Sequence, residues 1–465
     1  MQLIESMTGA RCNVPSLRNV TITNWKDNLV IRPAPARMAT GREAGRKVLS
    51  TYVFNQSVHY FITGITFPIL VLLIMDKGLG IAEAGVALAA YSAATILLEL
   101  PSGSLADTIG RKNIYLLSLG IQAAGGLALL LSFDLVTVMA AAATMGAARA
   151  FSSGSIDAWF IDEYRRAEPN GNIQHALARA GTFTPLGLGI GSLAGGAIPS
   201  LSGIWGPVIP LSTYSMNIVV MELMVAVQFI LTVAMVQENV TQHADKLGSV
   251  AGRLQNVIAT SFRHGVKNRT VLLLLFATLL FGISLSSLEL LWQPRVQSIL
   301  GTSELSWVLG VLAAGYFFSA SAGSVLSTRV CGLFHDRYPF VVFAFRLLAG
   351  VLLLLLAFQD TILGFALFYF LILMTEGVAD PPDATMYNAE LPGPVRSTML
   401  SFKSLVLQIG GLVGTLVIGF LAGAYSIGLA WTVAAVILGA SSLSYLFLAL
   451  RSAPVPVSEE TIGTA

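Results

Sequence analysis

Apolar residues are concentrated in twelve long runs, which are separated by short clusters of charged residues, proline, glycine and asparagine. A helix needs about 20 residues to cross a bilayer, and these runs are of that length. Because a backbone in lipid must satisfy its own hydrogen bonds, we expect each run to be helical. An even number of crossings places both ends of the chain on one side. The predicted helices cover residues 49–75, 81–101, 113–133, 135–158, 180–199, 214–236, 271–294, 305–328, 339–358, 361–384, 400–422 and 426–450.

The composition excludes most classes of soluble protein. Of the 465 residues, 55% are hydrophobic and only 11% are charged, against roughly 25% charged in an average soluble domain. This argues against a soluble enzyme, a nucleic-acid-binding protein and a secreted disulfide-rich domain. The two cysteines, Cys12 and Cys331, are too few and too distant for a disulfide framework or a zinc site. We expect no metal, no cofactor, no enzymatic activity and no nucleic-acid partner.

The basic residues predict the orientation in the membrane. If the N-terminus is cytoplasmic, 24 of the 27 Lys and Arg residues lie on the cytoplasmic side. Only Lys77 and Arg295 fall outside, and Arg149 lies within a predicted helix. This asymmetry follows the positive-inside rule. We therefore expect a multi-pass protein of the cell inner (plasma) membrane with both termini in the cytoplasm.

The turn after the second predicted helix carries the most specific motif in the chain. Gly103 and Gly110 permit close backbone approach and unusual dihedral angles. Asp107 can accept hydrogen bonds from a helix N-terminus, and Arg111 and Lys112 anchor the inner face. Such residues suit a latch that forms in one conformation and breaks in another. The segment resembles the loop 2–3 signature of the major facilitator superfamily, G-x-L-A-D-x-x-G-R-K-x-x-x-L, at every specified position.

This resemblance implies an all-α membrane fold of twelve transmembrane helices, in which two pseudo-symmetric six-helix bundles rock about a substrate cavity. We expect the bundles at 46–236 and 271–452, a disordered cytoplasmic extension at 1–45 and a cytoplasmic tail at 453–465. Residues 237–270 form the cytoplasmic loop between the bundles. Interleaved basic and apolar residues there are typical of an amphipathic helix on the membrane surface, and a plain linker is the alternative.

The charge of Arg149 lies deep in the fourth predicted helix. An intramembrane arginine normally faces a bundle interior or a hydrated cavity and needs a partner, which makes it a candidate for function. The segment resembles the superfamily's helix 4 motif, R-x-x-x-G, which is associated with proton coupling, although Gly154 falls one residue late. The alternative is a buried arginine that bonds backbone carbonyls between helices.

Small residues repeat along one face of the fifth predicted helix, where they allow close helix packing. Their spacing resembles the exporter signature of helix 5, G-x-x-x-G-P-x-x-G-G, with Ser192 in place of proline. The resemblance implies export, whereas the substitution leaves plain tight packing as an alternative. The residues that match the signature are Gly187, Gly191, Gly195 and Gly196.

Few acidic residues lie within the predicted helices, and their depths differ. Glu222 is close to the middle of its helix with no basic residue beside it, so it is the first candidate to carry a proton. Asp157 and Glu376 are the next candidates. Glu376 can pair with Arg346, and one acid near the inner face can pair with Arg111. The predicted proton-coupling residues are Glu222, Arg149, Asp157 and Glu376.

A polar row follows one side of the first predicted helix, where side chains would line a cavity rather than face lipid. Glu289 and Trp292, near the outer end of the seventh helix, are candidates to bind a cationic or hydroxylated substrate. For His59 and Glu289 the alternatives are a structural hydrogen bond and a position at the membrane interface. The predicted substrate-binding residues are Tyr52, Asn55, Gln56, His59, Tyr60, Glu289 and Trp292.

These features together predict a monomeric secondary active transporter in the lipid bilayer, with a small-molecule substrate and protons as its partners. We expect export of small amphipathic compounds, such as a drug or an antibiotic-like metabolite, by proton antiport with alternating access. The motifs resemble those of the drug/proton antiporter branch, so we expect the chain to belong to that branch. Proton-coupled nutrient symport is the first alternative, because the same fold supports it. A lipid-handling protein or a non-transporting receptor is the second.

Overall fold

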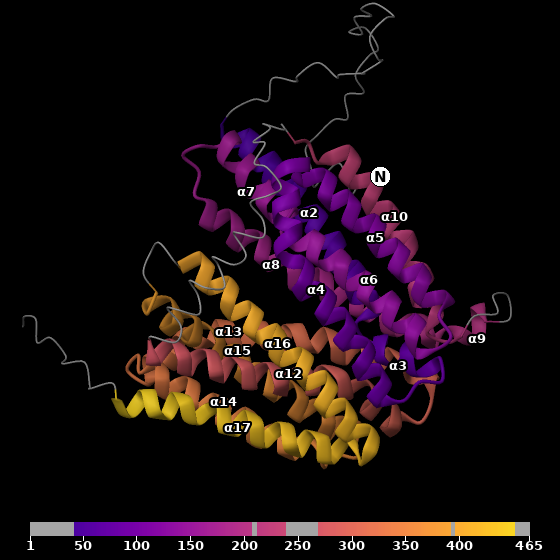
Figure 1. Ribbon diagram of the computed structural model, residues 1–465, viewed down its shortest axis with the longest axis vertical. Helices are drawn as coiled ribbons and strands as arrows, with labels where there is room; N and C mark the ends of the chain where they lie inside the picture. The colour runs from indigo at the N-terminus through magenta and orange to yellow at the C-terminus, as the bar shows by residue number, and fades with distance from the viewer. Residues whose placement is uncertain (1–40, 207–211, 239–267, 392–395, 452–465) are drawn as a thin grey trace, which may run out of the picture. The chain divides into compact units, whose positions relative to one another are not determined.

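The computed structural model describes residues 41–206, 212–238, 268–391 and 396–451, and within these ranges every regular element is a helix (Figure 1). The predicted amphipathic helix in the central loop, the tail and nearly all of the N-terminal extension lie outside the described residues. The first half of the chain contributes α2 (Arg42–Thr66), α3 (Leu70–Asp76), α4 (Ile81–Ile109), α5 (Arg111–Leu131), α6 (Leu135–Ser153), α7 (Ile156–Ala167), α8 (Ile173–Ser200), α9 (Ser202–Trp205) and α10 (Ser215–Met235). The second half contributes α12 (Arg269–Leu300), the 3-10 helix η2 (Ser303–Leu305), α13 (Trp307–Leu333), α14 (Tyr338–Leu356), α15 (Ile362–Ala389), α16 (Arg396–Ala424) and α17 (Ile427–Arg451).

Among the described residues, 10 helices are long and apolar enough to cross a membrane, or 11 if the bent pair α2 and α3 counts as one span. The remaining predicted span corresponds to α8, which has 28 residues. Its glycines, threonines and two prolines, Pro185 and Pro199, lower its mean hydropathy without ending the helix. Each of the twelve predicted segments is therefore largely helical, the first and the fourth being divided between two helices, and the all-α membrane fold is confirmed.

The first span is bent by 41° between α2 and α3, at Pro68. In a straight helix the Val71 amide would donate to the carbonyl of Phe67. Here Gln293 of α12 replaces that bond, because its Oε1 accepts from Val71 N at 2.9 Å and its Nε2 donates to Phe67 O at 2.8 Å. A side chain from the second half of the chain thus satisfies the break in the first span.

Proline positions explain where the predicted helix boundaries were wrong. The tenth predicted helix ended near residue 384, but α15 continues to Ala389 through Pro381 and Pro382. Pro382 cannot donate to the carbonyl of Val378. The hydroxyl of Ser327 in α13 donates to that carbonyl instead, at 2.8 Å. The helix therefore survives because a neighbouring helix supplies the missing donor.

The helices pack mainly within each half of the chain, α2–α10 in indigo to magenta and α12–α17 in orange to yellow (Figure 1). In the first half, α2 packs on α8 and α6 packs on both α4 and α5. In the second half, α12 packs on α16 and α17, and α13 and α14 both pack on α15. The two halves meet where α4 contacts α16 and where α8 contacts α13.

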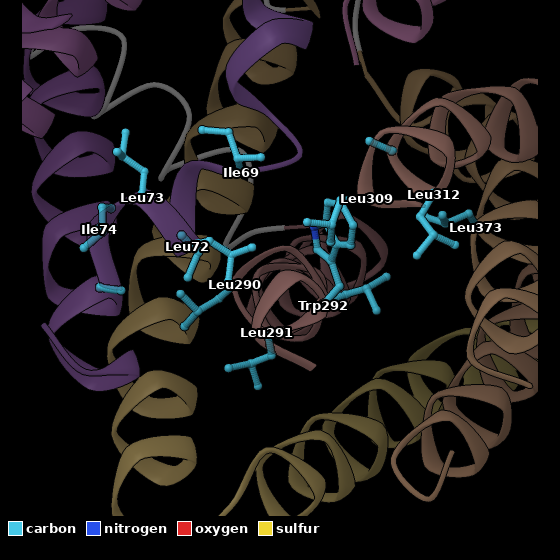
Figure 2. Close-up of a cluster of buried hydrophobic side chains, with 14 of the residues drawn as sticks. Ile69, Leu72, Leu73, Ile74, Leu290, Leu291, Trp292, Leu309, Leu312 and Leu373 are labelled. Atoms are coloured by element: carbon cyan, nitrogen blue, oxygen red, sulfur yellow. The ribbon is translucent and has the colours of Figure 1, made fainter. Parts of the chain in front are cut away.

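Several described contacts between the halves lie at the ends of the helices that are far from Arg42 and Arg451, and α4 and α16 also meet further along, where Gln408 Nε2 donates to Glu99 Oε2 at 2.9 Å. Ser200 Oγ, at the end of α8, accepts from Trp307 N at the start of α13, at 2.9 Å. Gly196 packs directly against Gly310, and Ala82 packs against Gly423. Figure 2 shows the apolar layer at this end, where side chains of α3, including Leu72, lie near those of α12, including Leu290.

Candidate functional site

Arg149 of α6 and Glu289 of α12 lie in opposite halves of the chain. Each residue is exposed, although the residues before and after it in the helix are buried. Arg149 and Glu289 attract each other electrostatically across the two halves. Arg149 also interacts with Tyr91 in α4. The arrangement fits the expectation that an intramembrane arginine faces a hydrated interior.

Glu289 contacts a cluster of aromatic residues. The hydroxyl of Tyr316 donates to Glu289 Oε1 at 3.3 Å. The Tyr316 ring lies 5.6 Å from Phe67 and 6.1 Å from Tyr369, measured between ring centroids. Trp292 is fully buried in the same cluster, 5.7 Å from Tyr369. Glu289 and Trp292, which the sequence predicted as substrate-binding residues, therefore lie beside one aromatic wall.

The structure divides the polar row of the first helix into three groups. Tyr52 and Gln56 both donate to Oδ1 of Asp157, at 2.7 and 2.9 Å. Asn55 is directed toward α10, where its Nδ2 donates to Thr232 Oγ1 at 2.8 Å. His59 and Tyr60 lie within the electrostatic field of Arg149. Two predicted substrate-binding residues thus contact a predicted coupling residue, and two adjoin Arg149.

Glu222 lies apart from the other predicted coupling residues. It faces Gly126 of α5, so closely that a Cβ atom at Gly126 would collide with its carboxylate. Glu222 Oε1 is buried and has no hydrogen-bond partner among the described residues. The structure therefore does not bring Glu222 together with Arg149, Asp157 or Glu376.

A second charged cluster lies in the C-terminal half, where Arg346 and Glu376 are buried and Asp380 is exposed. Arg346 Nη1 lies 3.3 Å from Glu376 Oε2, which is the ion pair that the sequence suggested. Arg346 Nη2 lies 3.7 Å from Asp380. One turn further along α15, Asp383 is held by Lys403 at 2.5 Å and by the Tyr445 hydroxyl at 2.7 Å.

Sequence reasoning missed Lys403 and Tyr445 as parts of this cluster. They are distant from α15 in the chain, and no pattern in α16 or α17 marks them. Asp383 was treated as part of a helix end because it follows Pro381 and Pro382. Only the continuation of α15 through both prolines places its carboxylate inside the bundle.

The loop 2–3 motif holds three elements of the N-terminal half together. Gly110 has a φ of 102°, in a region that glycine tolerates. Arg111 Nη1 lies 2.6 Å from Asp162 Oδ2, as the sequence suggested for one acid near the inner face. A Cβ atom at Gly103 would meet nothing within 4 Å, whereas a Cβ atom at Gly154 would lie 3.8 Å from Gly103 Cα, so the role of Gly103 in the latch stays a prediction. The side chain of Asp107 lies outside what the structure describes.

Glu238, which follows α10, is a member of this latch that the sequence did not reveal. Its two carboxylate oxygens accept from Arg111 N at 2.8 Å and from Lys112 N at 2.9 Å. Lys112 Nζ in turn donates to Val233 O at 3.0 Å. The latch therefore connects the start of α5 to α7 and to the end of α10.

The glycines of α8 face mainly inward within their own half. Gly187, Gly191 and Gly195 lie directly against the backbone of α2. Gly196 alone of the four predicted glycines lies against the other half, at Gly310 of α13. The first three therefore permit close packing of α8 on α2, and the fourth lies at a contact between the halves.

Most of the described helices are long and apolar enough to cross a bilayer, and opposite charges lie in the two sets of helices. Both features are typical of a multi-pass membrane transporter. Residues 52–402 match the Major Facilitator Superfamily. The chain belongs to this superfamily, and the resemblance carried by the loop 2–3 motif is confirmed at that level. No curated protein matches the sequence.

Solved structures share this fold at low sequence identity. The nucleoside transporter NupG matches with a TM-score of 0.70 and 13% identity over 87% of this chain and 100% of its own. A mutant of NupG matches with a TM-score of 0.71 and 12% identity over 86% and 99%. A bacterial homologue of the human lysosomal transporter Spinster, in an inward-facing and unoccupied conformation, matches with a TM-score of 0.66 and 15% identity over 89% and 100%.

Proposed function

We propose that the protein is a proton-driven exporter of small amphipathic molecules, of the drug/proton antiporter type, that works by alternating access. The observation that carries this proposal is the placement of Arg149 and Glu289. They lie in opposite halves of the chain, are exposed, and attract each other electrostatically. Charged groups in such a position bind polar parts of a substrate, and the aromatic wall beside Glu289 suits an apolar body.

Antiport follows if one carboxylate binds both ligands. A cationic group of the substrate and a proton compete for Glu289, since neutralising the carboxylate with one removes its attraction for the other. The transporter then exchanges a substrate for a proton at each cycle. With protons more concentrated outside the cell, the exchange drives the substrate outward.

The described contacts support a conformation that is open to the cytoplasm. The halves contact each other at the ends far from Arg42 and Arg451, including the bond between Ser200 and Trp307, and the described contact of α4 with α16 extends inward as far as Glu99 and Gln408. We place the protein in the cell inner membrane. By the positive-inside rule, both termini then lie in the cytoplasm and these helix ends lie on the outer side. One chain supplies both Arg149 and Glu289, which favours a monomer as the working unit.

Nutrient uptake by proton symport is the second candidate. Asp157 is held by Tyr52 and Gln56 rather than by a basic side chain. A proton on Asp157 and a substrate at Glu289 would bind together, as symport requires. NupG, which shares the fold, is a nucleoside transporter, and Ser192 stands where the exporter signature has proline.

Transport in proteoliposomes distinguishes the candidates by the direction of the pH gradient. Ethidium serves as an amphipathic cation and uridine as a nucleoside. Antiport is expected to accumulate ethidium in vesicles with an acidic lumen, and a protonophore should abolish the accumulation. Uridine accumulation driven by an acidic bath would instead establish symport. Movement of ethidium that ignores the gradient would indicate a facilitated or lipid-handling route.

Two matched Glu→Gln variants locate the carboxylate. Glu289→Gln is expected to abolish gradient-driven ethidium accumulation, because the side chain can no longer bind a proton. Glu222→Gln, which removes the carboxylate beside Gly126, is expected to retain it. The reverse result would return the coupling role to Glu222, and unchanged coupling in both variants would exclude both residues.

A further inference from the structure

The contact between α4 and α16 is tight near the outer ends of the two helices and loosens toward the cytoplasm. A Cβ atom at Gly85 would lie 2.4 Å from Thr415 O, so the backbones touch there. A Cβ atom at Gly103 would meet nothing within 4 Å. Since about five helical turns separate Gly85 from Gly103, both lie on the same face of α4. This face is therefore packed against α16 at one end and has open space at the other.

A hydrogen bond between the halves lies close to the point where the two helices separate. Gln408 Nε2 of α16 donates to Glu99 Oε2 of α4 at 2.9 Å. Glu99 lies about one turn before Gly103, on the same face of α4. It lies about 25 Å along the helix from Ala82, where α4 packs against Gly423 of α16. The bond joins the ends of two long side chains, whereas the helices touch directly near their outer ends.

The partner of Glu99 is a neutral carboxamide, and no ion pair of Glu99 is present in the part of the chain that the structure describes. Basic side chains of neighbouring helices interact elsewhere, namely Arg149 of α6 with Tyr91, Arg111 of α5 with Asp162, and Lys403 of α16 with Asp383. A carboxamide carries both a donor and an acceptor, so it bonds a carboxyl group in either protonation state. The bond between the halves therefore does not depend on whether Glu99 carries a proton.

We propose that Glu99 and Gln408 form a tether that limits how far the cytoplasmic ends of α4 and α16 separate when the transporter is open to the cytoplasm. This inference rests on the alternating access of the proposed function. Two side chains have a fixed reach, so a wider opening must break the hydrogen bond between them. The two residues are positioning residues, because they keep the halves close enough to return to the outward-open conformation.

Distances between spin labels measure this opening directly. Ile109 and Leu400 are exposed near the cytoplasmic ends of α4 and α16, so cysteines at these positions can carry the labels in a background with both Cys12→Ser and Cys331→Ser. Pulsed electron paramagnetic resonance of the full chain in detergent gives the distribution of distances. Gln408→Leu is expected to add a population at longer distances than the wild type shows. An unchanged distribution, or a shift to shorter distances, would overturn the proposal.

Substitutions on both helices separate this hydrogen bond from a general loosening of the fold. Glu99→Leu removes the same bond and is expected to lengthen the distances as Gln408→Leu does. The double variant should lengthen them no further, because both substitutions act on one contact. Glu99→Gln keeps an acceptor and should resemble the wild type. Gln174→Leu, at the exposed start of α8, is the matched control and should change nothing. Longer distances in Glu99→Gln, or in the control, would contradict the tether.

The distance measurement requires no transport, so the two proposals can fail separately. If gradient-driven ethidium exchange is present but the distances do not respond to Gln408→Leu, the tether fails and the transport proposal stands. If the wild type shows no such exchange and Gln408→Leu still lengthens the distances, the tether stands and the transport proposal fails. If both hold, Gln408→Leu is expected to slow ethidium exchange, because the cytoplasmic ends must travel further to close.

Discussion

The carboxylate of Glu238 accepts two backbone amides from the first turn of α5. The first amides of a helix have no partner within the helix, and a negative charge there is also favoured by the helix dipole. Glu238 thereby fixes the start of α5, where Arg111 reaches Asp162. The motif around Gly110 is visible in the sequence, but its acceptor is 127 residues away and no local pattern marks it.

Removing this acceptor should weaken the latch. Glu238→Ala is expected to destabilise the protein by about 1 kcal/mol, as loss of a helix cap typically does. Its midpoint of thermal unfolding in detergent should therefore be lower than that of the wild type, with Glu238→Gln between the two. An unchanged midpoint in Glu238→Ala would mean that water replaces the carboxylate without loss.

Single candidate residues could be selected from the sequence because a charge within an apolar run is conspicuous, and their function stays a prediction. Arg149, Glu289 and Asp157 were found in this way. Their groupings could not be predicted, since these depend on the rotation of each helix about its axis. The rotation of α10 about its axis directs Glu222 toward Gly126 rather than toward Arg149. Nothing in the sequence of α10 fixes that rotation.

At the scale of the element, the packing of α8 on α2 depends on glycine. Cβ atoms at Gly187, Gly191 and Gly195 would meet the carbonyl oxygens of Ser57, Phe61 and Ile65. Asn217 of α10 fastens the same contact, because its Nδ2 donates to Ile65 O at 2.9 Å and to Gly195 O at 2.7 Å. The repeat that resembles an exporter signature is thus also needed for close helix packing.

Alanine substitutions separate crowding from helix propensity. Gly191→Ala is expected to cost about 1–3 kcal/mol, because the added methyl group forces α8 away from α2. Gly181→Ala, in the same helix but with open space around it, should be neutral or slightly stabilising. Thermal unfolding of both purified variants provides the comparison, and equal midpoints would show that α2 and α8 adjust freely.

Helix positions were predictable along most of the chain, since long apolar runs have one stable form in lipid. Two departures from the predicted helices lie where a side chain from elsewhere replaces a backbone bond. Ser327 lets α15 pass Pro382, and Gln293 satisfies the bend between α2 and α3. Local sequence shows the proline but not the distant donor, so it predicts a break without predicting how the break is accommodated.

At the scale of the whole molecule, alternating access requires the contacts between α4 and α16 to part. A Cβ atom at Gly423 would lie 2.9 Å from the Cβ of Ala82, so the two helices need to move apart slightly to reach the roughly 3.5–4.5 Å between Cβ atoms in disulfides. In a background with both Cys12→Ser and Cys331→Ser, Ala82→Cys with Gly423→Cys is expected to cross-link on oxidation and to stop transport. A reducing agent should restore it, and each single cysteine serves as the control. Full transport by the cross-linked protein would show that this end does not open.

The carboxamide of Gln293 gives the bend of the first span a further meaning. While Gln293 occupies Phe67 O and Val71 N, these two backbone groups cannot bond each other. If the halves separate at this end, Gln293 leaves and the backbone pair becomes free to close. The bend of the first span therefore depends on the position of α12. We expect the bend to change when the two halves separate at this end.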